Sequence, residues 1–346
     1  MELNEIKQFV KNQKISDILE QYPYTSNFFD AIRLEVLDKN QNLLQIVKNV
    51  PEDHFNDYGL TSAKFIESFI TFVENIEKQV KEEEKHLESI TIIGGKNKSG
   101  DSENIQVTIK AGEIVCIVGP TGSGKSRLLE DIECIAQKDT PTMRQILLEG
   151  KIPKEEVRFE VGNKLVAQLS QNMNFVMDLS VKDFLEMHAQ SRMIENSKMV
   201  VEDIIICAND LAGEKFNGDV KVTQLSGGQS RALMVADIAM LSSSPIILID
   251  EIENAGIDKK KALETLVKRE KIILMSTHDP TLALMGHKRI VIKNGGIKKV
   301  IETSERERIN LPKLIEIDER LNKLRNVIRY GQELDFDINE FIEGGK

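Results

Sequence analysis

Hydrophobic positions along the chain recur with two different periods, and the change of period divides the sequence. Residues 1 to about 80 carry apolar side chains at three- and four-residue spacing, as in "ISDILEQY" and "SAKFIESFITFVENIEKQV". This spacing predicts short amphipathic helices. Proline, Asn, Asp and glycine in "YPYTSNFF" and "NVPEDHFNDYG" mark where these helices stop and start. The charged run "KQVKEEEKH" is typical of a solvated helix end that leads into a linker.

From about Leu87 the pattern changes to strands, "SITII", "IQVTI" and "EIVCIV", separated by glycine-rich turns. Helical spacing returns in "VKDFLEMHAQSRMI" and "MVVEDIIICANDLA", after which strands such as "PIILID" and "KIILMST" alternate with helices. Alternation of this kind predicts a parallel α/β core. The tail from Ser304 is charged and helical, and its apolar stripe suits docking or dimerisation.

These patterns predict three parts. We expect an N-terminal helical domain over 1–82, an α/β domain over 87–302 with a helical subdomain at about 175–235, and a helical C-terminal extension over 303–346.

Composition narrows the class of protein. With 346 residues, 40% of them hydrophobic and 29% charged, the chain has the make-up of a soluble globular protein. No apolar run approaches the roughly 20 residues that cross a bilayer, and the N-terminus lacks the pattern of a secretory signal. We therefore expect a cytoplasmic protein, for which any role in transport requires a separate membrane subunit. The net charge of −10 argues against a nucleic-acid partner.

The three cysteines, Cys116, Cys134 and Cys207, are far apart and match no metal-ligand spacing. We expect them to be small buried hydrophobic residues in a reducing compartment.

A glycine-rich loop stands between a predicted strand and a predicted helix. The segment "GPTGSGKS" at 119–126 fits the pattern G-x-x-x-x-G-K-[ST], in which backbone N–H groups wrap the phosphates of a nucleotide and side chains would block their approach. Lys125 adds a positive charge against the β- and γ-phosphates, and Ser126 offers a hydroxyl to Mg²⁺. The predicted nucleotide-binding residues are Gly119, Pro120, Thr121, Gly122, Ser123, Gly124, Lys125, Ser126 and Arg127.

Two adjacent carboxylates close the strand "PIILIDE". Ligands of parallel sheets bind beyond the carboxyl ends of the strands, so both acids should face the phosphate loop. We expect Asp250 to hold Mg²⁺, through water, and Glu251 to act as the general base on the attacking water.

The segment "LSGGQ", about 20 residues before "ILIDE", resembles the signature of ATP-binding cassette (ABC) ATPases, and the resemblance covers roughly residues 87–300. It implies a P-loop NTPase core, ATP and Mg²⁺ as ligands, and ATP hydrolysis. It also implies that the signature contacts ATP held by a second subunit. The signature residues are Leu225, Ser226, Gly227, Gly228 and Gln229.

Helix physics supports that implication. The signature opens a helix and so makes a second anion site at a helix N-terminus, yet the chain has one phosphate loop. Two chains arranged head to tail around a two-fold axis satisfy both ends, which predicts a homodimer with ATP sandwiched between the subunits.

Other positions carry over from the family one by one. "LSQNMNFVMDLSV" resembles the segment with the Q-loop glutamine, and the spacing to Val181 favours Gln171 over Gln168 as the Mg²⁺ and water sensor. "ILMSTHD" supplies His278, which matches the switch histidine that contacts the γ-phosphate and supports Glu251. "AGID" resembles the D-loop and places Asp258 near the dimer seam.

Two departures from the family stand out. "DEIENAGID" has Ile252 where proline is usual, and its D-loop is one residue longer, so communication between the two ATP sites should differ. "TIIGGKNKSGDSENIQ" lacks the usual adenine-stacking aromatic, so base recognition should rest on apolar contact or on another segment.

Three functions compete. The N-terminal part resembles a small helical domain that occurs alone or fused to iron–sulfur repair and redox proteins. This N-terminal domain, the missing adenine-stacking aromatic and the unusual D-loop favour an ATPase that remodels or activates a protein client through its N- or C-terminal helices, and the resemblance points to metallocofactor assembly. The alternatives are the ATPase subunit of a membrane transporter, peripheral at the inner membrane beside a permease, and a nucleotide switch with little turnover. A nucleic-acid machine of the SMC type is disfavoured because no long coiled-coil insertion is present.

Overall fold

The structure is a computed structural model, and the chain forms two compact units, residues 1–86 and 87–346. It describes residues 12–22, 25–34, 38–83, 87–159, 164–170, 175–192, 194, 196–255, 257–267 and 271–335. Within these ranges, no helix is both long enough and apolar enough to cross a membrane.

The first unit is helical, as the three- and four-residue spacing predicts. Its core is aromatic: the side chains of Phe29, Phe55, Phe65 and Phe69 are buried, and neighbouring ring centroids lie 5.0–6.3 Å apart. Such tilted ring pairs stabilise a small core beyond the area they bury. The described helices are α2 (Ile15–Gln21), α3 (Ser26–Ala31), α4 (Leu43–Asn49), α5 (Glu52–Asn56) and α6 (Ser62–Glu83).

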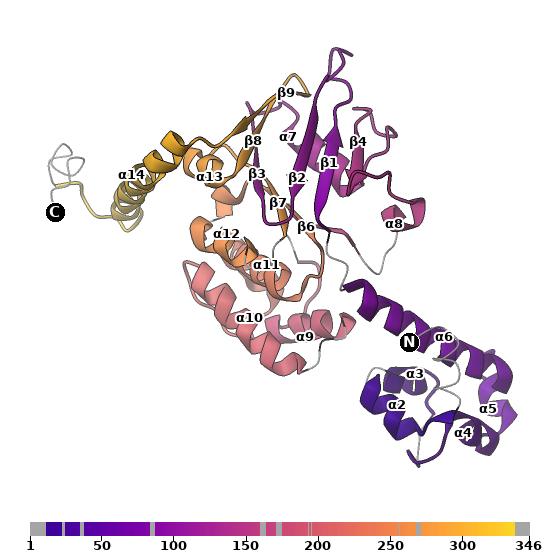
Figure 1. Ribbon diagram of the computed structural model, residues 1–346. Coiled ribbons are helices and arrows are strands. Elements are labelled where there is room, and N and C mark those ends of the chain that lie inside the picture. The colour runs from indigo at the N-terminus through magenta and orange to yellow at the C-terminus, as the bar shows by residue number, and fades with distance from the viewer. Residues whose placement is uncertain are drawn as a thin grey trace. The chain divides into compact units, whose positions relative to one another are not determined.

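The second unit contains two sheets (Figure 1). The smaller is antiparallel with the order β2-β1-β4, and its strands are β1 (Ser89–Ile93), β2 (Gln106–Lys110) and β4 (Gln145–Leu148). The larger has the order β5-β6-β7-β3-β8-β9 and is parallel except for β9. Its strands are β3 (Ile114–Val118), β5 (Val166–Leu169), β6 (Ile246–Asp250), β7 (Ile272–Ser276), β8 (Lys288–Lys293) and β9 (Gly296–Glu302). The predicted parallel α/β core is confirmed.

The central strand β3 shows why its sequence is apolar throughout. Val115 and Ile117 belong to a core cluster shared with the small sheet and helix α7 (Lys125–Glu133). Ile114 and Cys116 point to the opposite cluster, shared with α11 (Gly227–Leu241) and α12 (Lys259–Val267). Side chains alternate across a strand, so a strand covered on both faces needs apolar residues at every position.

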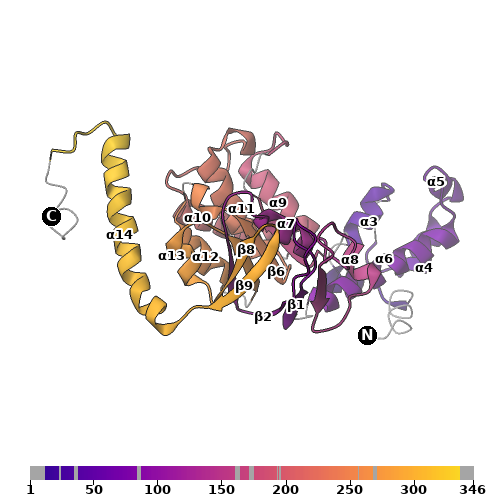
Figure 2. The same cartoon turned by 90° about the horizontal axis from the view of Figure 1, so that it is seen from above.

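A helical subdomain lies on one side of the larger sheet (Figure 1). It comprises α9 (Val181–Ser191), α10 (Ser197–Leu211) and α11, whose inner faces form a core of their own around Phe184, Ile204 and Leu233. The remaining helical segments are α8 (Glu155–Phe159), η2 (Val222–Gln224), η3 (Ile252–Ala255), α13 (Pro280–Met285) and α14 (Glu305–Arg329). Helix α14 follows β9 as a single long helix and buries none of its residues fully (Figure 2).

Candidate functional site

Three strand ends meet at one edge of the larger sheet. Strand β7 lies between β3 and β6, and Ser276 at its end pairs with both Ile117 and Asp250. The glycine-rich loop therefore follows β3, the carboxylate pair closes β6, and His278 follows β7, all at neighbouring positions. The topology thus brings the glycine-rich loop together with the carboxylate pair and His278, which follow it in the sequence by more than a hundred positions.

The glycine-rich loop 119–124 can lie where it does only because its key positions lack side chains. A Cβ on Gly119 would stand 2.4 Å from the carbonyl oxygen of Ile292. Gly124 has a φ of +106° directly before α7, and a Cβ there would stand 2.9 Å from the Cα of Gly295. The loop thus delivers the open N-terminus of a nine-residue helix, whose N–H groups no side chain caps.

The polar groups of the loop suit a polyphosphate with its metal ion. The Nζ of Lys125 is largely buried and donates to the carbonyl of Gly119 at 3.1 Å. The hydroxyl of Ser123 is buried and has no hydrogen-bond partner among the described residues, so a phosphate oxygen would satisfy it. Ser126 lies 3.3 Å from Asp250, Oγ to Oδ2, and a hydroxyl beside a carboxylate is the oxygen donor set that Mg²⁺ accepts. The residues present fit Mg-ATP.

The backbone of Glu251 is fixed in an uncommon conformation. Its φ is +49°, and its N–H donates to the carbonyl of Ser276 at 3.0 Å. The guanidinium of Arg231, from α11, donates to the carbonyl of Glu251 and to that of Ser170, each at 3.1 Å. Positive φ in a non-glycine residue persists only where the surroundings fix it, and such positions cluster at functional sites.

Arg231 also carries a buried charge toward this site. Burial lowers the pKa of its guanidinium, and the negative charges of Asp250 and Glu253 oppose that shift. The arginine links the signature helix to the segments that follow β5 and β6. The sequence reasoning missed it, although a cation on the apolar helix "SRALMVADIAML" was a visible signal.

His278 is held by a residue that the sequence reasoning also missed. Its Nδ1 lies 2.9 Å from Oε1 of Glu253, and its backbone N–H donates to the same oxygen at 2.8 Å. The side chain of Glu253 is 5% exposed and that of His278 is 62% exposed. A buried carboxylate therefore anchors one edge of an exposed imidazole.

The signature opens α11 with a reciprocal cap. The hydroxyl of Ser226 accepts from the N–H of Gln229 at 3.3 Å, and the side chain of Gln229 accepts from the N–H of Ser226 at 2.8 Å. Ser226 and Gly227 are exposed. A capping hydroxyl still carries its own hydrogen, so Ser226 and the first N–H groups of the helix remain available to an anion.

Asp258 of the predicted D-loop has a structural role. Its Oδ1 accepts from the N–H of Lys261 at 3.1 Å and so caps α12, while its own N–H donates to the carbonyl of Leu211 at the end of α10. The predicted position of Asp258 at a dimer seam stays a prediction.

Gln171 lies outside the described residues. Gln168, the other candidate, sits on β5, where its amide lies 2.7 Å from Glu133 at the end of α7, with its nitrogen as the donor. A glutamine engaged at the end of α7 distant from the phosphate loop is a poor metal sensor, which keeps Gln171 as the preferred residue.

The segment without an aromatic packs too closely for one. A Cβ on Gly94 would meet the carbonyl oxygen of Glu103 at 2.3 Å, and one on Gly95 would meet that of Thr142 at 2.0 Å. The next turn instead supplies a cation: the Nζ of Lys98 donates to the carbonyl of Gly122 in the glycine-rich loop at 2.9 Å.

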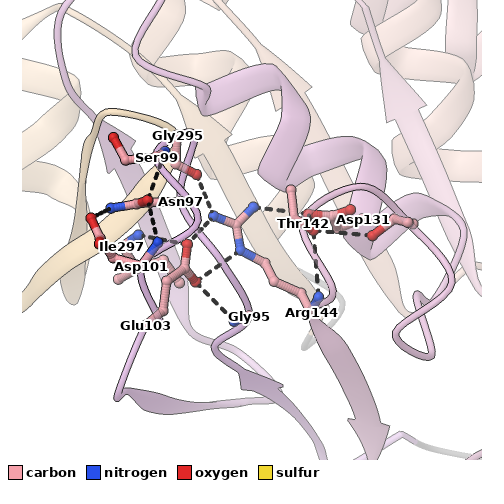
Figure 3. Close-up of polar contacts among 11 residues, drawn as sticks. Gly95, Asn97, Ser99, Asp101, Glu103, Asp131, Thr142, Arg144, Gly295 and Ile297 are labelled. Carbon is pink, nitrogen blue, oxygen red and sulfur yellow. Dashed lines mark hydrogen bonds and ion pairs between the residues drawn. The ribbon is translucent and has the colours of Figure 1, made fainter.

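A buried arginine holds this segment in place (Figure 3). Arg144 donates to Glu103 at 2.6 and 3.1 Å, to Asp131 of α7 at 2.8 Å and to the carbonyl of Gly295 at 2.7 Å. Burial by itself would lower the pKa of Arg144, but the two carboxylates more than offset it, and its pKa ends above the ordinary value. The network joins the glycine segment, α7 and the β8–β9 turn around the loop.

Comparison with known proteins adds relatives to this geometry. The ABC transporter family model matches residues 102–254. An uncharacterized ABC transporter ATP-binding protein of Methanocaldococcus jannaschii is 52% identical over 260 residues, which make up 75% of this chain and 99% of that protein.

More distant relatives match a smaller part. The macrolide export ATP-binding/permease protein MacB 2 of Yersinia pestis is 27% identical over 56% of this chain, and the match spans 29% of that longer protein. The solved ATP binding subunit of an ABC transporter has a TM-score of 0.50 at 17% identity, covering 65% of this chain and 94% of that one, which is a likeness of fold.

Proposed function

This chain belongs to the ABC transporter ATP-binding family, and from that premise we propose that it is the ATP-hydrolysing subunit of a membrane transporter, working as a head-to-tail dimer. The predicted ABC-type fold and ATPase activity are confirmed by the family. The observation that supports the dimer is the pair of helix N-termini, uncapped at α7 and capped by the exposed Ser226 at α11, in a chain with one phosphate loop.

In this proposal the chain's own residues divide the work. Lys125 and the N–H groups of α7 bind the β- and γ-phosphates, and Ser126 and Asp250, whose side chains are in contact, would hold Mg²⁺ together with Gln171. The metal ion, when bound, neutralises charge that develops on the phosphate oxygens. Glu251 accepts a proton from the attacking water, in a backbone fixed by Ser276 and Arg231.

The partner subunit completes the site. Ser226 and the glycines after it approach the γ-phosphate of the ATP held by the other subunit, whereas His278 contacts the γ-phosphate of the ATP held by its own subunit. The relatives named as transporter ATP-binding proteins support a permease as the further partner.

The dimer is tested with the variant Glu251→Gln, which keeps the shape of the side chain and removes the base. With Mg-ATP the variant should accumulate as a dimer in light scattering after size exclusion. Adding Ser226→Asp should abolish that dimer, because a carboxylate faces the partner's phosphate while the helix cap is retained. Ser304→Asp, at the N-cap of α14, is the matched control and should leave the dimer intact. A Glu251→Gln sample that stays monomeric in Mg-ATP refutes the sandwich.

A second candidate, remodelling of a protein client, is favoured by one observation. Three quarters of this chain align with the 52% identical relative, so about a quarter of the chain has no counterpart in it. Residues 1–86 form a compact unit of their own. Fractionation of native cells separates the candidates. Recovery with a multispanning membrane protein supports transport, and co-purification with a soluble metalloenzyme supports activation of a client. The involvement of metallocofactors stays a prediction.

A further inference from the structure

The side chain of Glu253 contacts His278, and the chemistry proposed for the site does not require this contact. Oε1 of Glu253 accepts two hydrogen bonds, from the hydroxyl of Thr277 at 3.0 Å and from the backbone N–H of His278 at 2.8 Å, and it lies 2.9 Å from Nδ1 of the same histidine. Its other oxygen is buried and has no hydrogen-bond partner among the described residues. Burying a carboxylate costs free energy unless its contacts compensate, so the burial of Glu253 indicates that this side chain has a role.

The contact fixes the orientation of the ring. A carboxylate only accepts, so Nδ1 carries a proton and Nε2 is the nitrogen left for a ligand. A carboxylate that fixes one ring nitrogen of a histidine while the other faces the ligand is common at metal and catalytic centres, where its loss typically costs about 10- to 100-fold in affinity or activity.

The grip also ties the histidine to the D-loop. Glu253 lies in η3, just before the D-loop, and Lys259 lies just after it and pairs with Asp279 at 2.6 Å. Both flanks of the D-loop thus hold the turn 277–279. Any movement of the D-loop on dimer closure would be transmitted to the ring.

We propose that Glu253 is a positioning residue for ATP hydrolysis, whose buried carboxylate holds the His278 ring through Nδ1 and couples it to the D-loop. This inference rests on the proposed role of His278.

Steady-state phosphate release by the full chain tests the proposal. Glu253→Ala should lower kcat about 10-fold or more and leave KM for ATP within about twofold, because the phosphate loop is untouched. In the His278→Ala background the same change should cause no further loss, because the ring it positions is gone. Glu253→Gln keeps an acceptor oxygen in the same volume and should retain most of the turnover.

The chain provides a matched control in a second carboxylate–imidazole pair. Asp237, 2% exposed, lies 3.1 Å from Nδ1 of His188 between α11 and α9, away from the phosphate loop. Asp237→Ala should lower the melting temperature and leave kcat unchanged.

Each outcome decides something. Wild-type kcat in Glu253→Ala, or losses that add in the double variant, overturns the proposal. Wild-type kcat in His278→Ala instead refutes the role of the histidine in the proposed function. If Glu253→Ala does not fold, ¹⁵N NMR of histidine-labelled wild-type protein tests the contact between Glu253 and His278 directly. When the ring of His278 is neutral, its proton must reside on Nδ1. An Nε2–H tautomer refutes the proposal.

Discussion

The buried arginine near the phosphate loop leads to a quantitative prediction. The side chain of Arg144 is 0% exposed, and those of its partners Glu103 and Asp131 are 2% and 1% exposed. Arg144→Met fills most of the volume but leaves two carboxylates buried without their cation. Breaking a buried ion pair in this way typically costs about 3–5 kcal/mol, and here two carboxylates lose the same partner. The loss is a large fraction of the roughly 5–15 kcal/mol by which a domain is stable.

The carboxylates retain some of their contacts, which limits the loss. Glu103 still accepts from the N–H groups of Gly95 and Ile297 at 3.2 Å, and Asp131 from the hydroxyl of Thr142 at 2.8 Å. We therefore expect Arg144→Met to lower the free energy of unfolding of the 87–346 unit by about 3–5 kcal/mol.

A triple variant separates charge from packing. Arg144→Met with Glu103→Gln and Asp131→Asn contains no buried ion, so it should recover most of the loss, as replacement of a whole buried ion network often does. Urea unfolding should be followed by hydrogen exchange and mass spectrometry, because peptides from β1, β2 and α7 report on this unit separately from residues 1–86. A single variant within about 1 kcal/mol of wild type, or a triple variant no more stable than the single one, refutes the reasoning.

Two further predictions follow from pKa values. The expectation that all three cysteines are buried is wrong for Cys134, which is exposed. Burial raises the pKa of both thiols, that of Cys116 to about 12, but only Cys134 is accessible. Iodoacetamide at pH 8 should therefore label Cys134 in the native protein and Cys116 only after unfolding, and rapid native labelling of Cys116 contradicts its burial. Burial opposes ionisation of Asp279, but Lys259, Thr281 and backbone N–H groups hold its pKa at about 2, below the ordinary 3.8. Its ionised form therefore stabilises the fold above about pH 4, and this contribution is lost as the pH falls toward 2. Asp279→Asn, which keeps the helix cap, should therefore be less stable than wild type at pH 6, with a difference that shrinks toward pH 2 in thermal melts; a constant difference contradicts the assignment.

The parts of the site that the sequence predicts are those defined by local spacing. The phosphate loop needs only a strand, glycines, a lysine and a hydroxyl in order, and the signature only a capped helix start, because anion binding by N–H groups is a property of consecutive residues. Even the contact between Ser126 and Asp250, 124 residues apart, could be expected, since carboxyl ends of neighbouring parallel strands share an edge.

The residues that escaped prediction act across long separations through side chains whose direction no local pattern encodes. Lys98 reaches Gly122, Arg231 reaches Ser170, and Arg144 reaches Glu103, 41 residues away. Arg144 and Arg231 are buried and Lys98 is exposed, and only the fold reveals which of these charges is buried and which carbonyl or carboxylate each one reaches. The segment 91–106 lacks an aromatic residue, and the close approach of the backbones of Glu103 and Thr142 to Gly94 and Gly95 is visible only in three dimensions.

Contacts on both sides of the D-loop suggest a physical role for its unusual length. At its start, Glu253 holds the turn of His278, and at its end Ile257 pairs with Ala212 while Asp258 donates to Leu211, both at the end of α10. The segment thus connects the turn that carries His278 to the helical subdomain, which also carries the signature that approaches the partner's nucleotide in the proposed dimer. A loop anchored at both ends can pass on a displacement only if it is long enough to reach both anchors, and we expect the extra residue to supply that length. Shortening it should therefore affect turnover before it affects nucleotide binding, because the phosphate loop lies outside the connection.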